Sequence, residues 1–561
     1  MSARRKRTHK RAAAQVSSPA SPWWLRAPAL AVTLVICAGT AAVRLRLAGV
    51  PLERDEGEYA YAGQLILQGI PTYHLAYNMK FPGTYYAYSL FLAVFGQTPS
   101  GIHTGLLLMN LATAVVLFFV GRRLLGEFGG AIAASTFAVM SLDRWILGVF
   151  AHATHFVLLP TLLALLLLLR AVDTRRAAGF VGAGVLLGIA VLMKQQAIFL
   201  LLFGMAFALA GVRANEGKWA PALKHTALVA AGAVVVFAVL CGVLAQQGVL
   251  QRFWFWTFQY ASAYVAEVPL WDAWSPLVFA WNVITQANLP IWSFGAFGAA
   301  ILWLGRWSAQ ARLFVTGLLL ASFLAVCPGF YFREHYFILL LPAAGLCAGV
   351  GAVWIERLLA RRVSAPLARA GALLVVLAAI AAYVANEGTY LFSMDTRELS
   401  RSRYGGNPFV EAPEIARHIQ QQTGPDDPVA VLGSEPEIYF YAQRKSATGY
   451  IYTYALMEPQ PYAARMQAEM IREITAMHPK YLVFAAVATS WQTRRTSDTT
   501  ILRWADRYTD TCYEVVGLAD IYSPAQSAVL WYAELTGYQP RSKNLIYTFV
   551  RKSDAPCAVA P

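Results

Sequence analysis

The sequence predicts a polytopic α-helical membrane protein with about eleven transmembrane helices and a C-terminal extracytoplasmic α/β domain. Of the 561 residues, 57% are hydrophobic and only 14% are charged, and the mean hydropathy is +0.47. A soluble globule of ordinary composition does not carry so much apolar surface. Apolar runs also recur between residues 27 and 387, and the basic residues gather in short segments between them. Both patterns are typical of membrane-spanning helices and their connecting loops.

Eleven apolar runs approach the ~20 residues that an α-helix needs to cross a bilayer. They lie at residues 27–47, 103–121, 129–147, 153–170, 177–193, 196–212, 225–246, 278–303, 311–328, 336–355 and 368–387. The preceding segment, residues 1–26, is basic, and we expect it to be cytoplasmic. The first run resembles a signal peptide by itself, but the many later runs favour a retained anchor.

The distribution of basic residues supports this count through the positive-inside rule. With the N-terminus inside, five basic loops fall on the cytoplasmic side: Arg122 and Arg123, Arg170 to Arg176, Arg213 to Lys224, Arg306 to Arg312, and Arg357 to Arg369. An odd number of spans then places residues 388–561 outside. The formal charge of +15 could suggest nucleic acid, but basic residues between apolar runs argue for membrane orientation instead.

The C-terminal segment, residues 388–561, alternates strand-like and helix-like stretches. Apolar runs typical of strands lie at residues 429–433, 481–488, 513–522 and 545–550. Helical periodicity marks residues 411–422 and 461–478. This alternation predicts a small α/β domain. The six cysteines lack metal-ligand spacing, and only Cys512 and Cys557 lie in this domain, where they could pair.

The first outside loop, residues 48–102, carries the most informative pattern. A helix beginning near Asp55 would have one apolar stripe, so it could lie in the membrane interface. Residues 84–95 form a second apolar segment that is too short to cross, with tyrosines suited to headgroup level. These helices would hold four charged residues at membrane depth beside the bundle: Asp55, Glu56, Glu58 and Lys80.

Four motifs, taken in order along the chain, resemble the GT-C superfamily of membrane glycosyltransferases. Within it the motifs particularly resemble family 39, the protein O-mannosyltransferases, and the related bacterial aminoarabinose transferase branch. The motifs are the Asp55-Glu56 pair after the first span, KFPGTYY at 80–86, FREHYFILLLPAAG at 332–345 and SEPEIYFYAQRKSATGY at 434–450. The chain departs from the relatives at Phe81, because they commonly have Lys-Pro-Pro where this sequence has Lys80-Phe81-Pro82.

The resemblance implies a glycosyltransferase of cell-envelope glycosylation in the bacterial inner membrane. Such an enzyme moves a sugar from a polyprenyl-phosphate donor to an acceptor hydroxyl at the extracytoplasmic face, usually with inversion. The acceptor could be a lipid, a glycan or a protein. No cofactor and no nucleic-acid partner are expected. Some GT-C enzymes use a divalent metal, but the branch resembled here generally does not.

Candidate site residues take roles in this chemistry. Asp55 is the predicted base or acceptor-orienting carboxylate, and Glu56 is a second catalytic candidate. Lys80, Arg333 and His335 would stabilise the leaving phosphate, since positive charge favours developing negative charge. The other predicted substrate-binding residues are Glu58, Tyr59 and Lys194, the last of which could contact the anionic carrier.

Each role has a structural alternative. Asp55 could cap the following helix, and Glu56 and Glu58 could compensate its dipole. Lys80 could extend to the lipid headgroups, and Lys194 could anchor a helix end. A local ion pair among Arg333, Glu334 and His335 is a further alternative.

Three other patterns favour structural interpretations. Aromatic residues between 252 and 271 are typical of an interfacial belt, with a lipid or sugar platform as the alternative. Asp143 and Arg144 suggest a salt bridge. His152 and His155 share a helix face, but no carboxylate lies near them in sequence, so we do not predict zinc.

Two functional alternatives to the enzyme remain open. A transporter or flippase would also need many spans and intramembrane charges. However, the charges here gather at outside ends, and no inverted repeat is evident. A non-catalytic protein of the same architecture is the second alternative, and it would tolerate Asp55→Asn.

Overall fold

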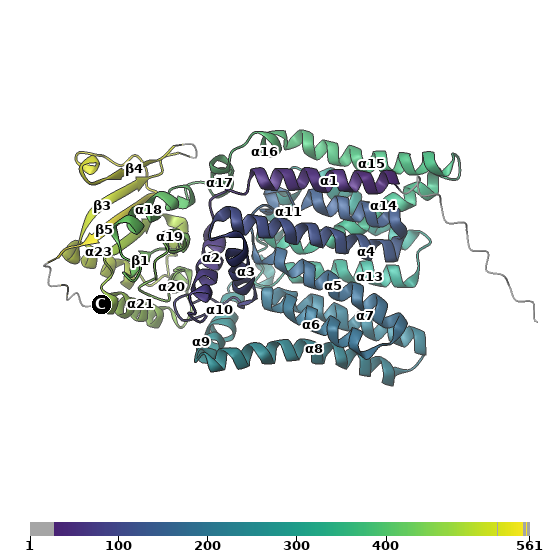
Figure 1. The fold of residues 1–561 in the computed structure, drawn as a ribbon, viewed down its shortest axis with the longest axis horizontal. Coiled ribbons are helices and arrows are strands. Elements are labelled where there is room, and N and C mark those ends of the chain that lie inside the picture. Colours follow the sequence, from purple (N-terminus) through teal and green to yellow (C-terminus); the bar gives the residue numbers. More distant parts are fainter. Residues whose placement is uncertain (1–26, 524–525, 554–556, 558–561) are drawn as a thin grey trace, which may run out of the picture.

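The structure is a computed structural model that describes residues 27–523, 526–553 and 557. The basic segment 1–26, predicted to be cytoplasmic, lies outside these residues. Long helices run side by side in one bundle, and a smaller domain containing a β-sheet lies at one end of it (Figure 1). The predicted fold class, a polytopic helical membrane protein with an α/β domain, is confirmed.

The bundle consists of long apolar helices. They are α1 (Ala27–Arg46), α4 (Pro99–Met140), α5 (Ala153–Thr174), α6 (Ala177–Met193), α7 (Ile198–Glu216), α8 (Trp219–Gln246), α11 (Trp274–Thr285), α12 (Leu289–Leu304), α13 (Ala309–Val326), α14 (Leu341–Leu359) and α15 (Ala365–Asn386). Within the described residues, eight helices are long and apolar enough to cross a membrane, and the bent pair α11 and α12 would make a ninth.

Two further spans are obtained when α4 is divided into two helices and α6 is counted as a span. The chain reverses inside α4 at Gly126, whose φ is 87°. A Cβ on Gly121 would lie 2.8 Å from the Cα of Gly130, although residues nine apart in one continuous helix are roughly 13 Å apart. α4 is therefore two antiparallel helices, and α6, with 17 residues, is slightly shorter than the other spans. Each of the eleven predicted spans thus corresponds to a helix or a bent pair.

One predicted span has the wrong boundary. The predicted span 129–147 ends at Met140, because residues 141–152 form irregular chain with one short 3₁₀ turn, Arg144–Ile146. The predicted salt bridge between Asp143 and Arg144 is also wrong. Arg144 Nε lies 2.6 Å from Glu387 Oε2, whereas Asp143 accepts hydrogen bonds from the Trp145 amide and from Asn288. Asp143 caps the short turn, so the two side chains point to different partners.

Basic loops meet at the end of the bundle opposite the α/β domain. Arg123 pairs with Asp173, and Arg175 Nε lies 3.3 Å from Glu216 Oε1. At the same end of the bundle, Arg357 Nη1 donates to the Arg306 carbonyl at 3.2 Å. These contacts bring the basic loops together on one side, as the sequence predicted. That this side faces the cytoplasm stays a prediction.

The α/β domain is built on one five-stranded sheet in the order β1-β2-β5-β3-β4. The strands are β1 (Val429–Leu432), β2 (Tyr481–Ala486), β3 (Tyr513–Asp520), β4 (Ala528–Trp531) and β5 (Leu545–Arg551). β1 and β2 are parallel, and the other pairs are antiparallel. Four of these strands correspond to predicted ones. β4 was missed because it is a four-residue edge strand that is only half-buried.

Helices pack around the sheet of this domain. α18 (Ala412–Gln422) and α21 (Ala463–Met477) correspond to the two predicted helical segments, whereas α23 (Thr500–Cys512) was not predicted. The shorter helices are α16 (Gly388–Phe392), α17 (Thr396–Tyr404), α19 (Glu437–Ala442), α20 (Tyr454–Met457) and α22 (Ala488–Trp491). Cys512 and Cys557 are neighbours, and both are free thiols in this structure. Their pairing as a disulfide stays a prediction.

Two helices of the first outside loop join the bundle to the domain. α2 (Arg54–Leu67) and α3 (Gly83–Phe95) lie between them (Figure 1). α2 is buried against α3 and α19, and its position at the membrane interface stays a prediction. Its close approach to α19 depends on Gly57, because a Cβ there would lie 2.6 Å from the Glu437 backbone nitrogen. The loop between α2 and α3, residues 68–82, carries Lys80 back toward α2.

We predict that Gly57→Ala destabilises the junction between α2 and the domain. The added methyl group would displace the α19 backbone, and such overpacking costs about 1–3 kcal/mol. Gly242→Ala is the matched control, because Gly242 is also helical and a Cβ there would meet no atom within 4 Å. Thermal unfolding in detergent should show a lower midpoint for Gly57→Ala than for Gly242→Ala. Equal midpoints would contradict the packing argument.

Candidate active site

A cavity of about 940 Å³ lies where the bundle meets the α/β domain. It brings together residues from the first outside loop, the 327–336 segment and the domain, which are far apart in sequence. Six of the eight predicted site residues line it: Asp55, Tyr59, Lys80, Lys194, Arg333 and His335. Glu56 and Glu58 are fully buried and do not line it.

Asp55 lies in the first turn of α2 with its carboxylate at the cavity wall. Its Oδ1 accepts a hydrogen bond of 2.8 Å from Lys80 Nζ, while Oδ2 lies 3.8 Å from His152 Nδ1. The alternative that Asp55 caps the helix is wrong, because the N-cap is Glu53, in a reciprocal capping box with Glu56. The Asp55 carboxylate is therefore available for contacts across the cavity.

Lys80 is held between two carboxylates. Besides Asp55, its Nζ donates to Glu58 Oε2 at 2.7 Å, and it lies 4.6 Å from the centre of the Tyr59 ring. The side chain is 23% exposed. The alternative that Lys80 extends to the headgroups is therefore wrong, because its ammonium group turns inward to this pair of acids.

The charges around Asp55 keep it ionised. Burial favours the neutral carboxyl group, but Lys80, His152 and Lys194 act in the opposite direction and hold the pKa of Asp55 well below its usual range. Burial likewise lowers the pKa of His152, to about 4, despite the nearby Asp55. At neutral pH, Asp55 is thus an anion beside an uncharged imidazole.

Glu56 and Glu58 are buried next to the cavity and contact the residues that line it or lie close to it. Glu56 Oε1 accepts hydrogen bonds from the Ala151 amide at 2.5 Å and faces His103 Nε2 at 2.8 Å. Glu58 accepts from Tyr85 through its second oxygen, at 2.5 Å. These contacts occupy both carboxylates and give no support to Glu56 as a catalytic group. The geometry indicates that Glu56 positions the segment before α5, and that Glu58 orients Lys80.

Two cations face the cavity without an acidic partner among the described residues. Lys194 ends α6 and places its Nζ 4.2 Å from the centre of the Tyr336 ring. Burial lowers the pKa of Lys194 to about 7, although Asp55 opposes this shift. Arg333 is exposed, and its guanidinium group lies 5.7 Å from the Tyr331 ring. No ion pair joins it to Glu334 in the described part of the chain, so the local ion-pair alternative is not seen.

His152 and His335 stack with their ring centres 4.1 Å apart. Together with Asp55 they offer three ligand atoms within 4.8 Å of one another. Both ring nitrogens of the buried His152 lack a hydrogen-bond partner within the described ranges. One carboxylate and two imidazoles would suit zinc or a similar ion. However, Lys80 already occupies Asp55 Oδ1, and its charge opposes a second cation there. His155 does not line the cavity.

The α/β domain contributes Tyr452, which the sequence did not single out. Its hydroxyl donates to Asp55 Oδ1 at 3.2 Å, and Lys80 Nζ lies 5.5 Å from the centre of its ring. No sequence signal marked this residue, because it follows the 434–450 motif in an irregular segment. The domain therefore completes the surroundings of the Asp55–Lys80 pair.

Arg54 connects the same helix to the domain. Its Nη2 lies 2.9 Å from Glu435 Oε1 in a buried ion pair. Two further donors reach the Ser434 carbonyl at 2.5 Å and the Tyr454 hydroxyl at 2.8 Å. The structure uses Glu435 to hold the residue next to Asp55 in place.

The aromatic segment 252–271 divides between two roles. Trp271 is 83% exposed and suits an interfacial belt. Trp256 and Tyr260 are buried and line the cavity. They belong to a π-helical turn, Phe255–Tyr260, between α9 (Leu250–Trp254) and α10 (Ala261–Val265). The exposed part of the segment fits a belt, and whether the cavity-lining part binds lipid or sugar stays a prediction.

Known proteins share this architecture. A family model described as dolichyl-phosphate-mannose-protein mannosyltransferase matches residues 80–241. ArnT from Cupriavidus metallidurans, bound to undecaprenyl phosphate, has a similar structure: the TM-score is 0.54 at 15% identity, covering 93% of this chain and 100% of that one. The archaeal oligosaccharyltransferase AglB from Archaeoglobus fulgidus, in complex with an inhibitory peptide and a dolichol-phosphate, has a TM-score of 0.53 at 14% identity, covering 92% and 75%.

No curated protein matches this chain in sequence. The structural matches have low identity and show a shared fold. Together with the family model, they confirm the resemblance to GT-C membrane glycosyltransferases that the sequence predicted.

We predict that Arg54→Met strongly destabilises the protein, whereas Arg54→Met combined with Glu435→Met does so much less. Removing one partner leaves a buried charge unpaired at a cost of about 3–5 kcal/mol, but replacing both partners removes that charge. Thermal unfolding of the two variants and of Arg397→Met, an exposed arginine, measures the difference. A double variant no more stable than Arg54→Met would contradict this account of the pair.

Proposed function

We propose that the protein transfers a sugar from a polyprenyl-phosphate donor to an acceptor hydroxyl at the extracytoplasmic membrane surface. One observation carries the proposal. An ionised carboxylate, Asp55, shares a single cavity with two cations, Lys194 and Arg333, at the junction of an apolar bundle and a polar domain, and neither cation has an acidic partner within the described ranges. A carboxylate can orient an acceptor, and cations can hold a phosphate, so both substrates of such a reaction would find a suitable group.

The donor would place its phosphate at the free cations. Arg333 can give two parallel hydrogen bonds to a phosphate, and Lys194 adds a point charge. The carrier chain needs an apolar surface next to these groups. Ile198, Phe258 and Val265 line the same cavity and provide one. A lipid-linked phosphate therefore matches the cavity in both charge and polarity.

The reaction would proceed by displacement at the anomeric carbon. The acceptor oxygen forms a bond to that carbon while the bond from carbon to the phosphate oxygen breaks. The configuration at the anomeric carbon is therefore inverted. The electron pair leaves with the polyprenyl phosphate, whose new negative charge is stabilised by Lys194 and Arg333. The acceptor proton passes to the free Oδ2 of Asp55. All atoms are accounted for without a cofactor.

The low pKa of Asp55 shapes its role. A carboxylate held ionised by Lys80 is a weak base, so it accepts a proton only once the acceptor oxygen has begun to bond to carbon. Binding of the donor phosphate near Lys194 would offset part of the positive charge that lowers this pKa. Asp55 would then become more basic when the donor is present. Its first task is to orient the acceptor, and its second is to receive the proton.

The domain would assist through Tyr452. Its hydroxyl and Lys80 Nζ both bond to Oδ1 of Asp55, which leaves Oδ2 as the free oxygen. This arrangement fixes the direction in which Asp55 presents its remaining lone pairs. The α/β domain would therefore take part in building the site, in addition to any role in acceptor recognition.

The structural relatives support the choice of donor. ArnT is bound to undecaprenyl phosphate, and AglB to a dolichol-phosphate and an inhibitory peptide. Both ligands contain a polyprenyl-type phosphate, as the cavity of this chain would require. The acceptor here would be a lipid, glycan or protein hydroxyl.

We further propose the orientation that the basic loops favour. The N-terminus would be cytoplasmic and the α/β domain extracytoplasmic, in the inner membrane of a bacterium. Eleven spans are consistent with termini on opposite sides. The cavity would then open to the side on which lipid-linked sugars are used.

The transporter alternative gains no support from the cavity. Alternating access places a binding site near the bilayer midplane, between two halves of the bundle. Here the charged groups lie at one end of the bundle, and Tyr452 of the attached domain contacts Asp55. Surface chemistry accounts for this arrangement, whereas transport does not require it.

We expect Asp55→Asn to lower release of the polyprenyl phosphate carrier by at least about 100-fold, the scale of a lost acid-base group. Tyr452→Phe should cost about tenfold through one lost hydrogen bond to a charged group. Asp272→Asn, an exposed aspartate outside the cavity, is the control. Purified protein in lipid, incubated with a panel of polyprenyl-phosphate sugars, provides the measurement. Undiminished release by Asp55→Asn would remove Asp55 from the mechanism.

We also expect donor affinity to fall as pH rises from 6 to 8.5. Lys194, with a pKa of about 7, is cationic at the lower pH and loses its charge as pH rises. A polyprenyl-phosphate sugar is a diester with a constant single charge over this range, and His152, with a pKa of about 4, stays neutral. Lys194→Arg should retain affinity at both pH values, because arginine remains charged. Equilibrium binding of the donor at each pH tests this, and an unchanged affinity in the wild type would contradict it.

A further inference from the structure

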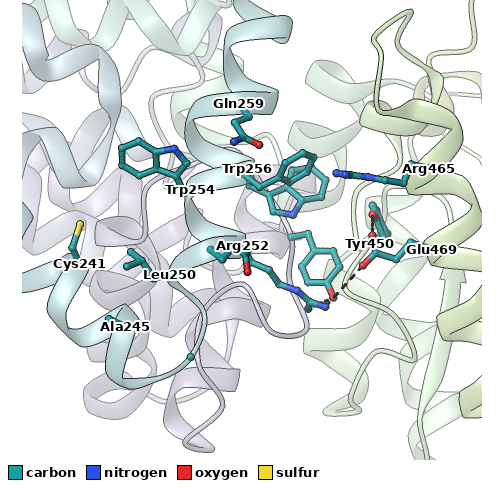
Figure 2. A pocket seen from close by; sticks show the side chains of 14 residues that line it. Cys241, Ala245, Leu250, Arg252, Trp254, Trp256, Gln259, Tyr450, Arg465 and Glu469 are labelled. Carbon is teal, nitrogen blue, oxygen red and sulfur yellow. Dashed lines mark hydrogen bonds and ion pairs between the residues drawn. The ribbon is translucent and has the colours of Figure 1, made fainter.

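A second cavity, of about 960 Å³, lies beside the candidate active site. Figure 2 shows that its walls come from the end of α8, from α9 and the π-helical turn, and from the α/β domain. Tyr77 and Trp256 line both cavities, and their stacked rings, with centres 5.9 Å apart, form the common wall. Asp55 and Lys80 do not line this second cavity, so the proposed transfer reaction does not use it.

One side of the second cavity is apolar. Cys241 and Ala245 belong to the last turns of α8, and Leu250 begins α9. Next to them Trp254 is 48% exposed and packs against Phe258 in a tilted arrangement, with ring centres 4.4 Å apart. α8 is an apolar span, so its end lies where acyl chains give way to headgroups. Tryptophan is the residue that favours this level of a membrane.

The other side carries charge. Arg252 comes from the bundle and Arg465 from the domain, so the two guanidinium groups enter from opposite walls (Figure 2). Arg465 lies 4.7 Å from the Phe255 ring and has no ion-pair partner in the described part of the chain. Arg252 donates to the Tyr77 hydroxyl, and its Nη2 lies 3.9 Å from Glu469 Oε1. Two cations and one acid give the lining a net positive charge.

We propose that this cavity binds the headgroup of a membrane phospholipid from the leaflet on the side of the α/β domain. The phosphate would lie between Arg252 and Arg465, since guanidinium groups bind phosphate oxygens through paired hydrogen bonds. One acyl chain would run along the apolar end of α8. Glu469 would remain free to accept a hydrogen bond from a headgroup ammonium or hydroxyl group.

The shape and polarity of the cavity favour a lipid over a water-soluble phosphate. A soluble anion would use the arginines but leave the apolar wall of Cys241, Ala245 and Leu250 without a partner. An uncharged lipid would cover that wall but leave Arg465 unpaired. A phospholipid is the membrane component that satisfies both sides at once. Its headgroup would contact Tyr77, which lies three residues before Lys80 in the same loop.

Fluorescence quenching tests this proposal without any sugar donor. Full-length protein in detergent is titrated with phosphatidylglycerol and with phosphatidylethanolamine that carry brominated chains, and tryptophan emission is followed. Brominated diacylglycerol, which lacks the phosphate, is the lipid control. The chain has 16 tryptophans, so quenching must be assigned to this cavity. The quenching of Trp254 is the difference between the quenching of the wild type and that of Trp254→Phe. We expect both phospholipids to quench this part and diacylglycerol to do so only weakly.

Arginine variants identify the phosphate contact. Arg465→Gln should weaken phospholipid affinity about tenfold, the scale of one hydrogen-bonded charge. The double variant Arg252→Gln and Arg465→Gln should weaken it about 100-fold. Arg397→Gln, an exposed arginine outside the cavity, should leave affinity unchanged. Thermal unfolding checks that each variant is folded. Arg465→Lys, which keeps the charge, should recover part of the affinity if Arg465→Gln loses it.

Three results would overturn the proposal. Equal affinity for diacylglycerol would show that the phosphate is not recognised. Unchanged affinity in Arg465→Gln would show that this arginine does not bind the headgroup. Competition by inorganic phosphate as effective as that by phospholipid would assign the cavity to a soluble anion. None of these results depends on sugar transfer, so they are separate from a failure of the proposed function.

Discussion

The ion pair between Asp55 and Lys80 is the interaction on which the rest of the site depends. A partly buried carboxylate is costly unless a cation and hydrogen bonds compensate for lost water. Lys80 supplies the charge, and Glu58 and Tyr452 hold both partners in one geometry. Because Lys80 lies in the loop 68–82, this pair also sets the path of the chain between α2 and α3. Lys194 and Arg333, which have no acidic partner among the described residues, then add positive charge to the same cavity.

The α/β domain is part of the site because α2 is buried between it and the bundle. Arg54 and Asp55 are neighbours on that helix, and each contacts the domain, one through Glu435 and the other through Tyr452. Gly57 permits the close approach of α19 to the same helix. A displacement of the domain would therefore change the surroundings of Asp55. This coupling gives the domain a physical role in the site even before any acceptor is considered.

Much of the architecture could be predicted from local sequence. The apolar runs located every span, and the basic loops located one end of the bundle, because hydropathy and charge are properties of short segments. Asp55 and Lys80 could be selected from the first outside loop and its resemblance to a known family. The N-cap Glu53 was missed, since a capping box with glutamate at both positions is a less common pattern than one with aspartate or serine. β4 escaped prediction because four half-buried residues carry almost no periodic signal.

Polarity along the chain alone decided that this protein has a helical membrane bundle with a separate α/β domain. Each helix can be recognised from its own apolar residues, so no distant contact is needed. The tertiary structure decided that Asp55, His152, His335 and Tyr452 meet, because these residues come from four segments whose spacing in sequence has no relation to distance. It also decided that Glu56 and Glu58 turn away from the cavity while Lys194 and Arg333 face it, with no acidic partner in the part of the chain that the structure describes. Which charges pair and which stay free depends on packing between elements, and a linear sequence does not display that packing.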